Sequence, residues 1–140
     1  MPGLKYFSYS DYGKTLLKQM HYSQAVRVGD NIEISGQGGW DPATGKVHSD
    51  LLDEIDQAFS NVDLTLKDAG GKGWSQVYRI RLYALNEAWT SEGMGRMVEN
   101  MMKWAPDHAP ILTGVGVAKL GQPGMRIEVE VSAYDPQGAQ

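Results

Sequence analysis

The sequence predicts one domain of the α/β class, α+β in type, in which a mixed β-sheet carries two helices on one face. Apolar residues recur with a helical period between Asp50 and Ala69, and apolar and polar residues alternate from Met125 to Tyr134. The predicted order is strands, helix, strand, helix, strands. Such a crossover unit with flanking hairpins places its helices on one side of the sheet. We expect the uncovered face to meet partner subunits.

The composition indicates a globular chain. It has 140 residues, 41% of them hydrophobic and 21% charged, which matches an average domain. No internal repeat, low-complexity segment or long linker divides the sequence. We therefore assign residues 1–140 to a single domain.

The first predicted elements are two short strands around a turn. Gln24–Val28 and Ile32–Ser35 flank Gly29-Asp30-Asn31, residue types that accept positive φ angles. A glycine-rich loop follows over Gly36–His48, with an Asp-Pro-x-Thr-Gly turn at Asp41–Gly45. A hairpin and a loop thus precede the first helix.

The segment Asp50–Ala69 is predicted to be an amphipathic helix. Ser49 or Asp50 can cap its start, and Gly70-Gly71 supplies a left-handed stop. Asp53 and Glu54 complement the positive end of the helix dipole. The apolar positions follow a 3.6-residue period: Leu51, Leu52, Ile55, Ala58, Phe59, Val62, Leu66 and Ala69.

A strand and a second helix follow. Trp74–Leu85 alternates, with Tyr78, Ile80 and Leu82 expected on the buried face and Arg79 and Arg81 on the other. The helix Ser91–Trp104 contains two glycines, each of which costs about 1 kcal/mol relative to alanine. Its expected apolar stripe consists of Met94, Met97, Val98 and Met101.

Two final strands, Ile111–Leu120 and Met125–Tyr134, are joined by a Gly-Gln-Pro-Gly turn and are expected to form a closing hairpin. In the last strand Arg126, Glu128, Glu130 and Ser132 share the polar face.

Composition excludes several function classes. The net charge of −4 and the pI near 5.3 oppose binding to nucleic acid, which needs a basic surface. The absence of cysteine excludes disulfides, thiolate nucleophiles and sulfur-ligated metals. No apolar run is long enough to span a membrane, and Met1–Phe7 lacks the features of a secretory signal. We therefore expect a cytoplasmic protein without membrane partners.

No motif indicates a metal or a cofactor. His21, His48 and His108 are far apart and lack ligand spacing, so we expect no metal site and no cofactor. Ser35 does not stand in a Gly-x-Ser-x-Gly elbow. The glycines at 36–39 and 70–73 lack nucleotide-loop spacing. The first cluster either lets the backbone approach a ligand or a neighbouring chain, or has only a structural role; the second caps a helix.

Two predicted strands contain residues that indicate a functional site: a pair of glutamates on one strand and a pair of glycines on the other. Glu128 and Glu130 share a face, where a carboxylate can transfer protons or orient water. The alternative is a cross-strand ion-pair ladder with Arg79 and Arg81, which we favour for Glu130. Gly114 and Gly116 share one face of their strand, which indicates that a ligand or a subunit comes close there.

Several segments together resemble one family. In chain order they are Tyr22-Ser23-Gln24, Ile34-Ser35-Gly36-Gln37, the Asp-Pro-x-Thr-Gly turn, Pro110 with Gly114–Leu120, and Ile127–Glu130 with Ser132-Ala133-Tyr134. From about Tyr22 to Tyr134 the chain resembles the Rid proteins, also called the YjgF family. The resemblance implies a chorismate-mutase-like fold, a homotrimer with sheets packed into a central barrel, and ligand clefts at subunit boundaries.

The resemblance also implies an activity. Founding members hydrolyse enamines and imines such as 2-aminoacrylate and 2-iminobutanoate to 2-keto acids and ammonia, without metal or organic cofactor. An arginine two residues after the proline of a Pro-Ala-Arg motif holds the substrate carboxylate. Here that position is Leu112, which offers neither charge nor donor, whereas a guanidinium–carboxylate contact contributes about 1.5–3 kcal/mol. Only another basic side chain, such as Arg126 or a neighbour's arginine, would compensate.

Carried over position by position, the resemblance implies a substrate cleft lined by Tyr22, Ser35, Gly36, Leu112, Thr113, Gly114 and Glu128. Glu128 would orient or deprotonate water, and Tyr22 would donate a hydrogen bond. The first hypothesis is therefore imine hydrolysis on a less anionic, more apolar substrate than 2-iminobutanoate. The alternatives are a trimer that binds a metabolite without catalysis and, third, a ribonuclease, which the acidic charge and the lack of a histidine pair disfavour.

Overall fold

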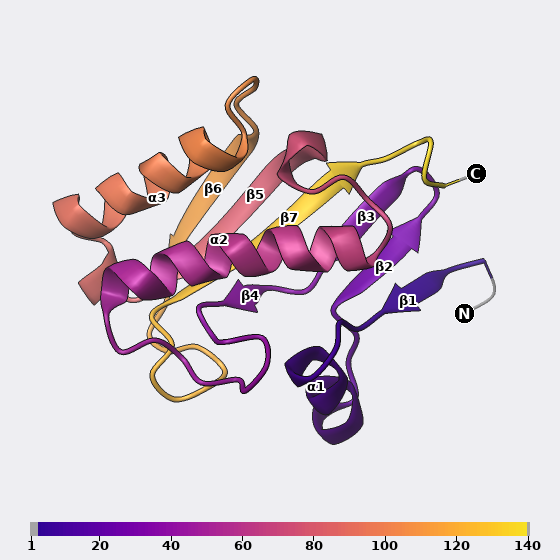
Figure 1. Ribbon diagram of the computed structural model, residues 1–140. Helices are drawn as coiled ribbons and strands as arrows, with labels where there is room; N and C mark the ends of the chain where they lie inside the picture. Colours follow the sequence, from indigo (N-terminus) through magenta and orange to yellow (C-terminus); the bar gives the residue numbers. More distant parts are fainter. Residues whose placement is uncertain (1–2, 140) are drawn as a thin grey trace.

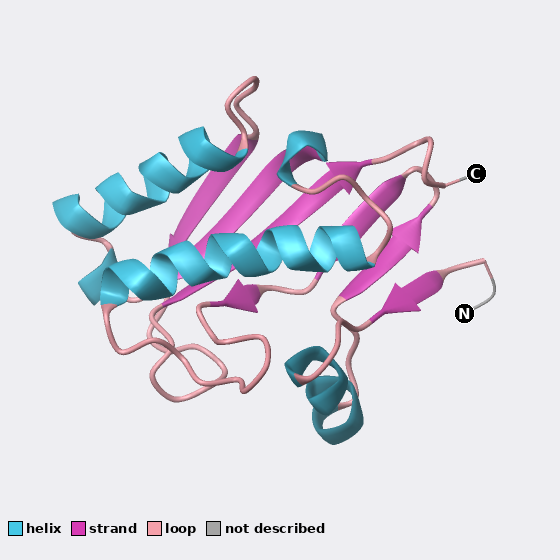
Figure 2. Cartoon of the chain, viewed as in Figure 1, coloured by secondary structure: helices cyan, strands magenta, loops and turns pink. Residues whose placement is uncertain are grey.

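The sheet of this protein follows the mixed pattern that the sequence predicts (Figures 1 and 2). The computed structural model describes residues 3–139. The strand order is β1 (Lys5–Phe7), β2 (Ala25–Val28), β3 (Asn31–Ile34), β7 (Ile127–Tyr134), β5 (Val77–Ala84) and β6 (Ile111–Gly116). The short strand β4 (Gln37–Gly38) pairs with β7 beyond the end of β3. Only β5 and β6 are parallel; the other pairs are antiparallel.

Two helices cover one face of the sheet, as predicted (Figure 1). They are α2 (Leu51–Asp68) and α3 (Ser91–Trp104), which pack against each other. The Asp50 carboxylate accepts a hydrogen bond from the Asp53 N–H at 3.0 Å, and the Thr90 hydroxyl accepts one from the Gly93 N–H at 3.1 Å. Both helices thus begin at side-chain caps, which occupy backbone donors that lack helical partners. Among residues 3–139, no helix has the length and apolar character needed to cross a membrane.

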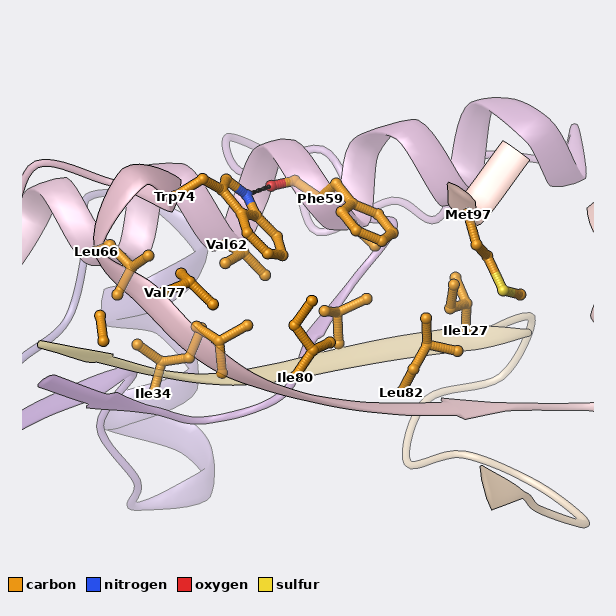
Figure 3. Close-up of a cluster of buried hydrophobic side chains, with 14 of the residues drawn as sticks. Ile34, Phe59, Val62, Leu66, Trp74, Val77, Ile80, Leu82, Met97 and Ile127 are labelled. Atoms are coloured by element: carbon orange, nitrogen blue, oxygen red, sulfur yellow. Dashed lines mark hydrogen bonds between the residues drawn. The ribbon is translucent and has the colours of Figure 1, made fainter. Parts of the chain in front are cut away.

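The hydrophobic core lies between α2 and the sheet (Figure 3). Phe59 stacks on Trp74 with ring centroids 5.3 Å apart, and the Trp74 indole N–H donates to the Phe59 carbonyl at 2.9 Å. Ile80 and Leu82 of β5 and Ile127 of β7 are buried in the same core. Burying side chains of this size stabilises a fold by about 1.5–3 kcal/mol each. The core therefore fixes β5 and β7 at the centre of the sheet.

The predicted closing hairpin is wrong. Strand β6 ends at Gly116 and pairs in parallel with β5, whereas β7 lies between β3 and β5. The connection over residues 117–126 is therefore a long loop rather than a tight turn. Local turn composition does not determine which strand is the partner, and the fully buried apolar face of β7 favours a central position.

The buried faces predicted for β5 and α3 differ in part from those in the structure. Strand β5 follows a 3₁₀ turn, η1 (Trp74–Gln76), and a register shift between Val77 and Arg79 leaves Tyr78 exposed instead of buried. On α3 only Met97 of the predicted stripe is fully buried. Met94 and Val98 are about half exposed, at 48% and 49%, because α3 touches the rest of the domain along a narrower line than the apolar pattern indicates.

A third helix and two strands were not predicted. Helix α1 (Tyr12–Met20) and strand β1 precede the first predicted hairpin (Figure 1). The helix has nine residues, follows Asp11 at φ 64° without a side-chain cap, and ends at His21 in the left-handed region. Asp11 is a common N-cap residue type, but its side chain accepts no helical N–H, and the left-handed residue at the end is His21 and not the usual glycine. The Gly36–His48 segment, predicted as a loop, contains β4 and a bridge between Trp40 and Val47.

Candidate active site

The helix-free face of β7 carries two carboxylates with different surroundings. Glu130 lies opposite Arg81 of β5, with 3.5 Å between the Arg81 Nη1 and the Glu130 Oε2. It also accepts a hydrogen bond from the Tyr83 hydroxyl at 3.0 Å. The predicted cross-strand ion pair is therefore present at Glu130. Glu128 lies opposite Tyr83 and, on its other side, opposite Gly38 of β4.

Glu128 is held close to the Gly36 backbone. A Cβ atom on residue 36 would overlap the Glu128 carboxylate, so a larger residue there would require the Glu128 side chain to move. Burial, and to a smaller degree the negative charge of Glu130, raise the pKa of the Glu128 carboxyl. A carboxyl in such surroundings keeps its proton at higher pH than one in water, which suits a group that both accepts and donates protons.

Tyr22 and Glu128 line the same cavity, which has a volume of about 390 Å³. Burial is the main cause that raises the pKa of Tyr22, and the charges of Tyr12 and Glu128 add to it. Its phenol therefore remains a proton donor at neutral pH. Tyr22 also borders a neighbouring hollow that Ser35, Gly36 and Glu130 line. Four of the predicted site residues, from segments far apart in the chain, thus meet around the end of β3.

A buried hydrogen-bond network fixes the backbone around Ser35 and Gly36, next to the cavity. The Tyr9 hydroxyl donates to Gln37 Oε1 at 2.9 Å, and the Gln37 amide donates to Gln24 Oε1 at 2.7 Å and to the Ser35 carbonyl at 3.1 Å. The Ser35 hydroxyl donates to the Ser23 carbonyl at 2.7 Å. That donation ties the segment before β2 to the end of β3, beside Gly36.

The other three predicted residues lie elsewhere in the chain. Leu112, Thr113 and Gly114 belong to the edge strand β6, which β5 separates from β7 by two strand spacings, about 10 Å. Leu112 pairs with Ile80 and Gly114 with Leu82, on the helix-covered face, whereas Thr113 pairs with Arg81 on the Glu130 face. A single chain therefore does not bring β6 to Glu128.

Two expectations about neighbours of the site need correction. The surface over Gly114 and Gly116 is occupied by Trp89 of the same chain, which follows the 3₁₀ turn η2 (Asn86–Ala88). Arg126 is bound to Glu54 of α2, with 2.7 Å between its Nε and the Glu54 Oε1, and also donates to the Ser49 carbonyl at 2.9 Å. It does not share the Glu128 face and does not replace an arginine at position 112.

Comparison with known proteins places this arrangement in a family. Residues 13–135 match the endoribonuclease L-PSP family, and the fold matches solved YjgF proteins. The chain belongs to the Rid (YjgF) family. The mixed sheet with helices on one face is thus the Rid fold, as the sequence resemblance implies.

Three Rid-family relatives illustrate the similarity. A 2-iminobutanoate/2-iminopropanoate deaminase from Dermatophagoides farinae is 31% identical over 110 residues, which cover 78% of this chain and 81% of that protein. A RutC family protein from Aquifex aeolicus is 40% identical over 62 residues, 44% of this chain and 49% of the relative, so that match spans about half of the relative's length. The Mycobacterium tuberculosis protein Rv2704 shares the fold, with a TM-score of 0.74, 22% identity, and coverage of 94% and 99% of the two chains.

Two of the three histidines of this Rid protein, His48 and His108, have structural partners. His48 lies 3.2 Å from Gln57 Oε1, and His108 lies 2.7 Å from the Val77 carbonyl. Over residues 3–139 no three side chains of His, Asp or Glu converge in a way that would hold a metal ion. The ionisable groups around the candidate site include the Glu128 and Glu130 carboxyls, the Tyr22 phenol and, at the neighbouring hollow, the His21 imidazole, and the chemistry of such groups is proton transfer.

Sequence analysis missed one wall of the cavity. Tyr12 and Met20 of α1, Trp40 after β4, and Met125 before β7 all border the space in front of Glu128. The available signal was the dense run of tyrosines before residue 23, which is unusual for a loop. No local pattern connects those tyrosines to a segment that lies about 100 residues later.

Proposed function

We propose that this Rid-family protein hydrolyses the C=N bond of a small imine, or of the enamine that tautomerises to it, and releases ammonia. The observation that carries the proposal is the partly buried Glu128 carboxyl, which shares a cavity with the Tyr22 phenol. The similarity to a protein named as a 2-iminobutanoate/2-iminopropanoate deaminase supports it. Neither a metal nor an organic cofactor is needed for this reaction.

In the proposed reaction, water attacks the carbon of the protonated imine while the Glu128 carboxylate accepts a proton from that water. The product is a neutral carbinolamine. Glu128 then returns the proton to the amine nitrogen and accepts the hydroxyl proton as the C–N bond breaks. A carbonyl compound and ammonia leave, and the proton passes from Glu128 to ammonia. Tyr22 donates a hydrogen bond to the reacting atoms and orients the substrate.

The substrate is proposed to be less anionic than 2-iminobutanoate. Leu112 stands at the position where the family pattern has an arginine for the substrate carboxylate. A leucine side chain provides no charge and no hydrogen-bond donor, and Arg126 is already engaged by Glu54. An imine that carries a carboxylate would thus lose a charge-assisted contact.

The proposed active form is a homotrimer in which β6 of a neighbouring chain supplies the missing wall. All six residues of β6 are exposed in the single chain, including Ile111, Leu112 and Val115. Exposed apolar residues on an edge strand are typical of an interface. In this arrangement Leu112, Thr113 and Gly114 would reach the cavity of the next subunit.

The test of the proposed reaction is ammonia release from freshly generated imines with and without an anionic group. We expect turnover, and we expect Glu128→Gln to reduce it by about 100-fold or more, in the usual range for general acid–base groups. Glu99→Gln on α3, whose side chain is 69% exposed, is the matched control. Unchanged turnover in Glu128→Gln would remove Glu128 from the reaction.

Two further measurements bear on the alternatives. Ligand-induced melting shifts without ammonia release would favour a binding protein over an enzyme. Light scattering is expected to give three times the chain mass of 15.4 kDa. A monomer at assay concentration would leave the cavity without its second wall and would overturn the proposed site.

A further inference from the structure

We propose that α1 forms a selectivity pocket for the substrate, and that this pocket takes a compact aromatic or branched apolar group on a ligand without negative charge. The inference rests on the proposed function, because it concerns the cavity that contains Glu128. The proposed selectivity concerns which ligands bind in that cavity and does not depend on the reaction that they undergo.

One face of α1 borders the cavity. Tyr12, Leu16, Gln19 and Met20 all line it and stand at helical positions i, i+4, i+7 and i+8. The opposite face of the helix carries Lys14 and Lys18, which are exposed. The amphipathic pattern of α1 thus faces a hollow space along part of its apolar side instead of a filled core.

Aromatic rings make the wall rigid. The Tyr12 ring meets the Trp40 ring edge to face, with centroids 5.3 Å apart and an interplanar angle of 66°. Trp40 is buried, and its indole N–H donates to the Tyr9 hydroxyl at 3.0 Å. A wall of rings in fixed positions favours flat or branched apolar groups, because aromatic contacts depend on ring geometry.

Two hydrogen bonds between segments far apart in the sequence close one side of the cavity. The Tyr12 hydroxyl donates to Gln122 Oε1 at 2.6 Å, and the Gln122 amide donates to the Gly45 carbonyl at 3.0 Å. These bonds join α1, the 41–45 turn and the loop after β6. The Tyr12 ring also packs against Gly45, where a Cβ atom would overlap it. The depth of the pocket is therefore set by contacts within the chain.

Charge selects the ligand class. Among residues 3–139, no lysine, arginine or histidine lines the cavity, and Glu128 is the one acidic side chain there. Whether ionised or protonated, Glu128 does not attract an anion, and its ionised form repels one. A neutral or cationic C=N group is the complementary partner. The volume of about 390 Å³ is near the lower end for small-molecule sites, which suits one ring with a short polar head.

The test compares three stable probes by titration calorimetry. Benzamidinium has a planar C=N group, a ring and a positive charge; benzoate has the same shape with a negative charge; acetamidinium has the C=N group without the ring. We expect benzamidinium to bind at least 10-fold more tightly than either of the others. Equal affinities for benzamidinium and benzoate, or no detectable benzamidinium binding, would overturn the inference.

A pair of variants locates the binding. Met20 on α1 and Met102 on α3 are both exposed methionines, at 66% and 68%, and only Met20 borders the cavity. Met20→Trp is expected to weaken benzamidinium binding at least 10-fold, whereas Met102→Trp should leave it unchanged. Equal effects of the two variants would show that α1 does not form the pocket.

The binding experiments and the imine-hydrolysis assay can fail independently of each other. If benzamidinium binds as expected but no imine is hydrolysed, the ligand class stands and the proposed hydrolysis is wrong. If imines are hydrolysed but carboxylate-bearing ones are preferred and benzoate binds as well as benzamidinium, the hydrolysis stands and the ligand class is wrong.

Discussion

Gly114 lies directly against Trp89, and a Cβ atom added to residue 114 would stand 2.8 Å from the Trp89 Cη2. The indole N–H of Trp89 donates to the Ala84 carbonyl at 3.0 Å, which fixes the ring over β6. Two residues further on, a Cβ atom at Gly116 would lie 3.7 Å from Trp89 Nε1, an ordinary contact. The two glycines on one face of β6 therefore differ in what they tolerate.

We expect Gly114→Ala to lower the free energy of unfolding by about 1–3 kcal/mol, because overpacking forces the Trp89 ring from its position. Gly116→Ala is the matched control and is expected to change stability by less than about 0.5 kcal/mol. Urea denaturation measures both. Equal midpoints for the two variants would show that Trp89 does not constrain β6.

A buried ion pair joins β2 to the segment that follows β7. The Arg27 Nη2 lies 2.5 Å from the Asp135 Oδ2, with side-chain exposures of 10% and 3%, and the Arg27 Nε donates to the Ala69 carbonyl at 2.9 Å. Asp135→Asn would leave the arginine charge buried without a counter-ion, which typically costs about 3–5 kcal/mol. The exposed Arg96–Glu99 pair serves as control: Glu99→Gln should cost at most about 0.5 kcal/mol. Similar losses for both would contradict this role of Asp135.

The same pair predicts acid sensitivity. The hydrogen bond from Arg27, reinforced by the one from Gln76, holds the pKa of Asp135 below its ordinary value of 3.8. As the pH falls, the Asp135 carboxylate is therefore protonated at a higher pH in the unfolded chain than in the folded protein. The stabilisation is complete above pH 3.8 and is lost as the pH falls through the lowered pKa of the folded state. Acid unfolding curves are expected to show this loss in the wild type and not in Asp135→Asn.

The spacing of apolar residues within single segments was enough to predict several helices and strands of the fold. The apolar positions of α2 and the alternation of β7 are each visible within one segment, and both elements form as predicted. The partner of β6 is not a local property. The turn residues between β6 and β7 are compatible with a hairpin, yet β7 pairs with β3, β4 and β5, and β6 pairs with β5 at the edge of the sheet. Long-range competition for the central position decides that pairing.

The candidate site was predictable only through the family resemblance. Tyr22 and Glu128 are more than 100 residues apart, and no periodicity relates them. The structure brings these two to one cavity, beside Ser35 and Gly36, and leaves Leu112 on another strand. The apolar wall was missed because α1 has only nine residues and ends at His21, without the glycine that usually marks a helix end.

Glu128 is expected to reduce stability at neutral pH. Burial and the charge of Glu130 raise its pKa in the folded protein above the ordinary value of 4.5. The folded protein holds this proton where the unfolded chain has released it, so stability falls as the pH rises through that window. Glu128→Gln should therefore unfold at a higher temperature than the wild type at neutral pH, and this advantage should vanish below pH 4.5. A variant that is less stable than the wild type at neutral pH would contradict the unfavourable burial of this carboxylate.

Leu112→Arg is expected to restore activity toward carboxylate-bearing imines. In the proposed trimer this side chain faces a neighbour's cavity, and its 49% exposure in the single chain leaves room for a longer side chain. A guanidinium–carboxylate contact is charge-assisted and contributes about 1.5–3 kcal/mol, which corresponds to a gain of about 10- to 150-fold in kcat/KM on 2-iminobutanoate. Met102→Arg on α3 is the matched control, because residue 102 is also exposed, at 68%, but does not border the cavity and does not lie on β6. If both variants gain equally, the effect is a general one of added positive charge. If neither gains, position 112 does not face the substrate, and the loss of the arginine does not explain the selectivity of this protein.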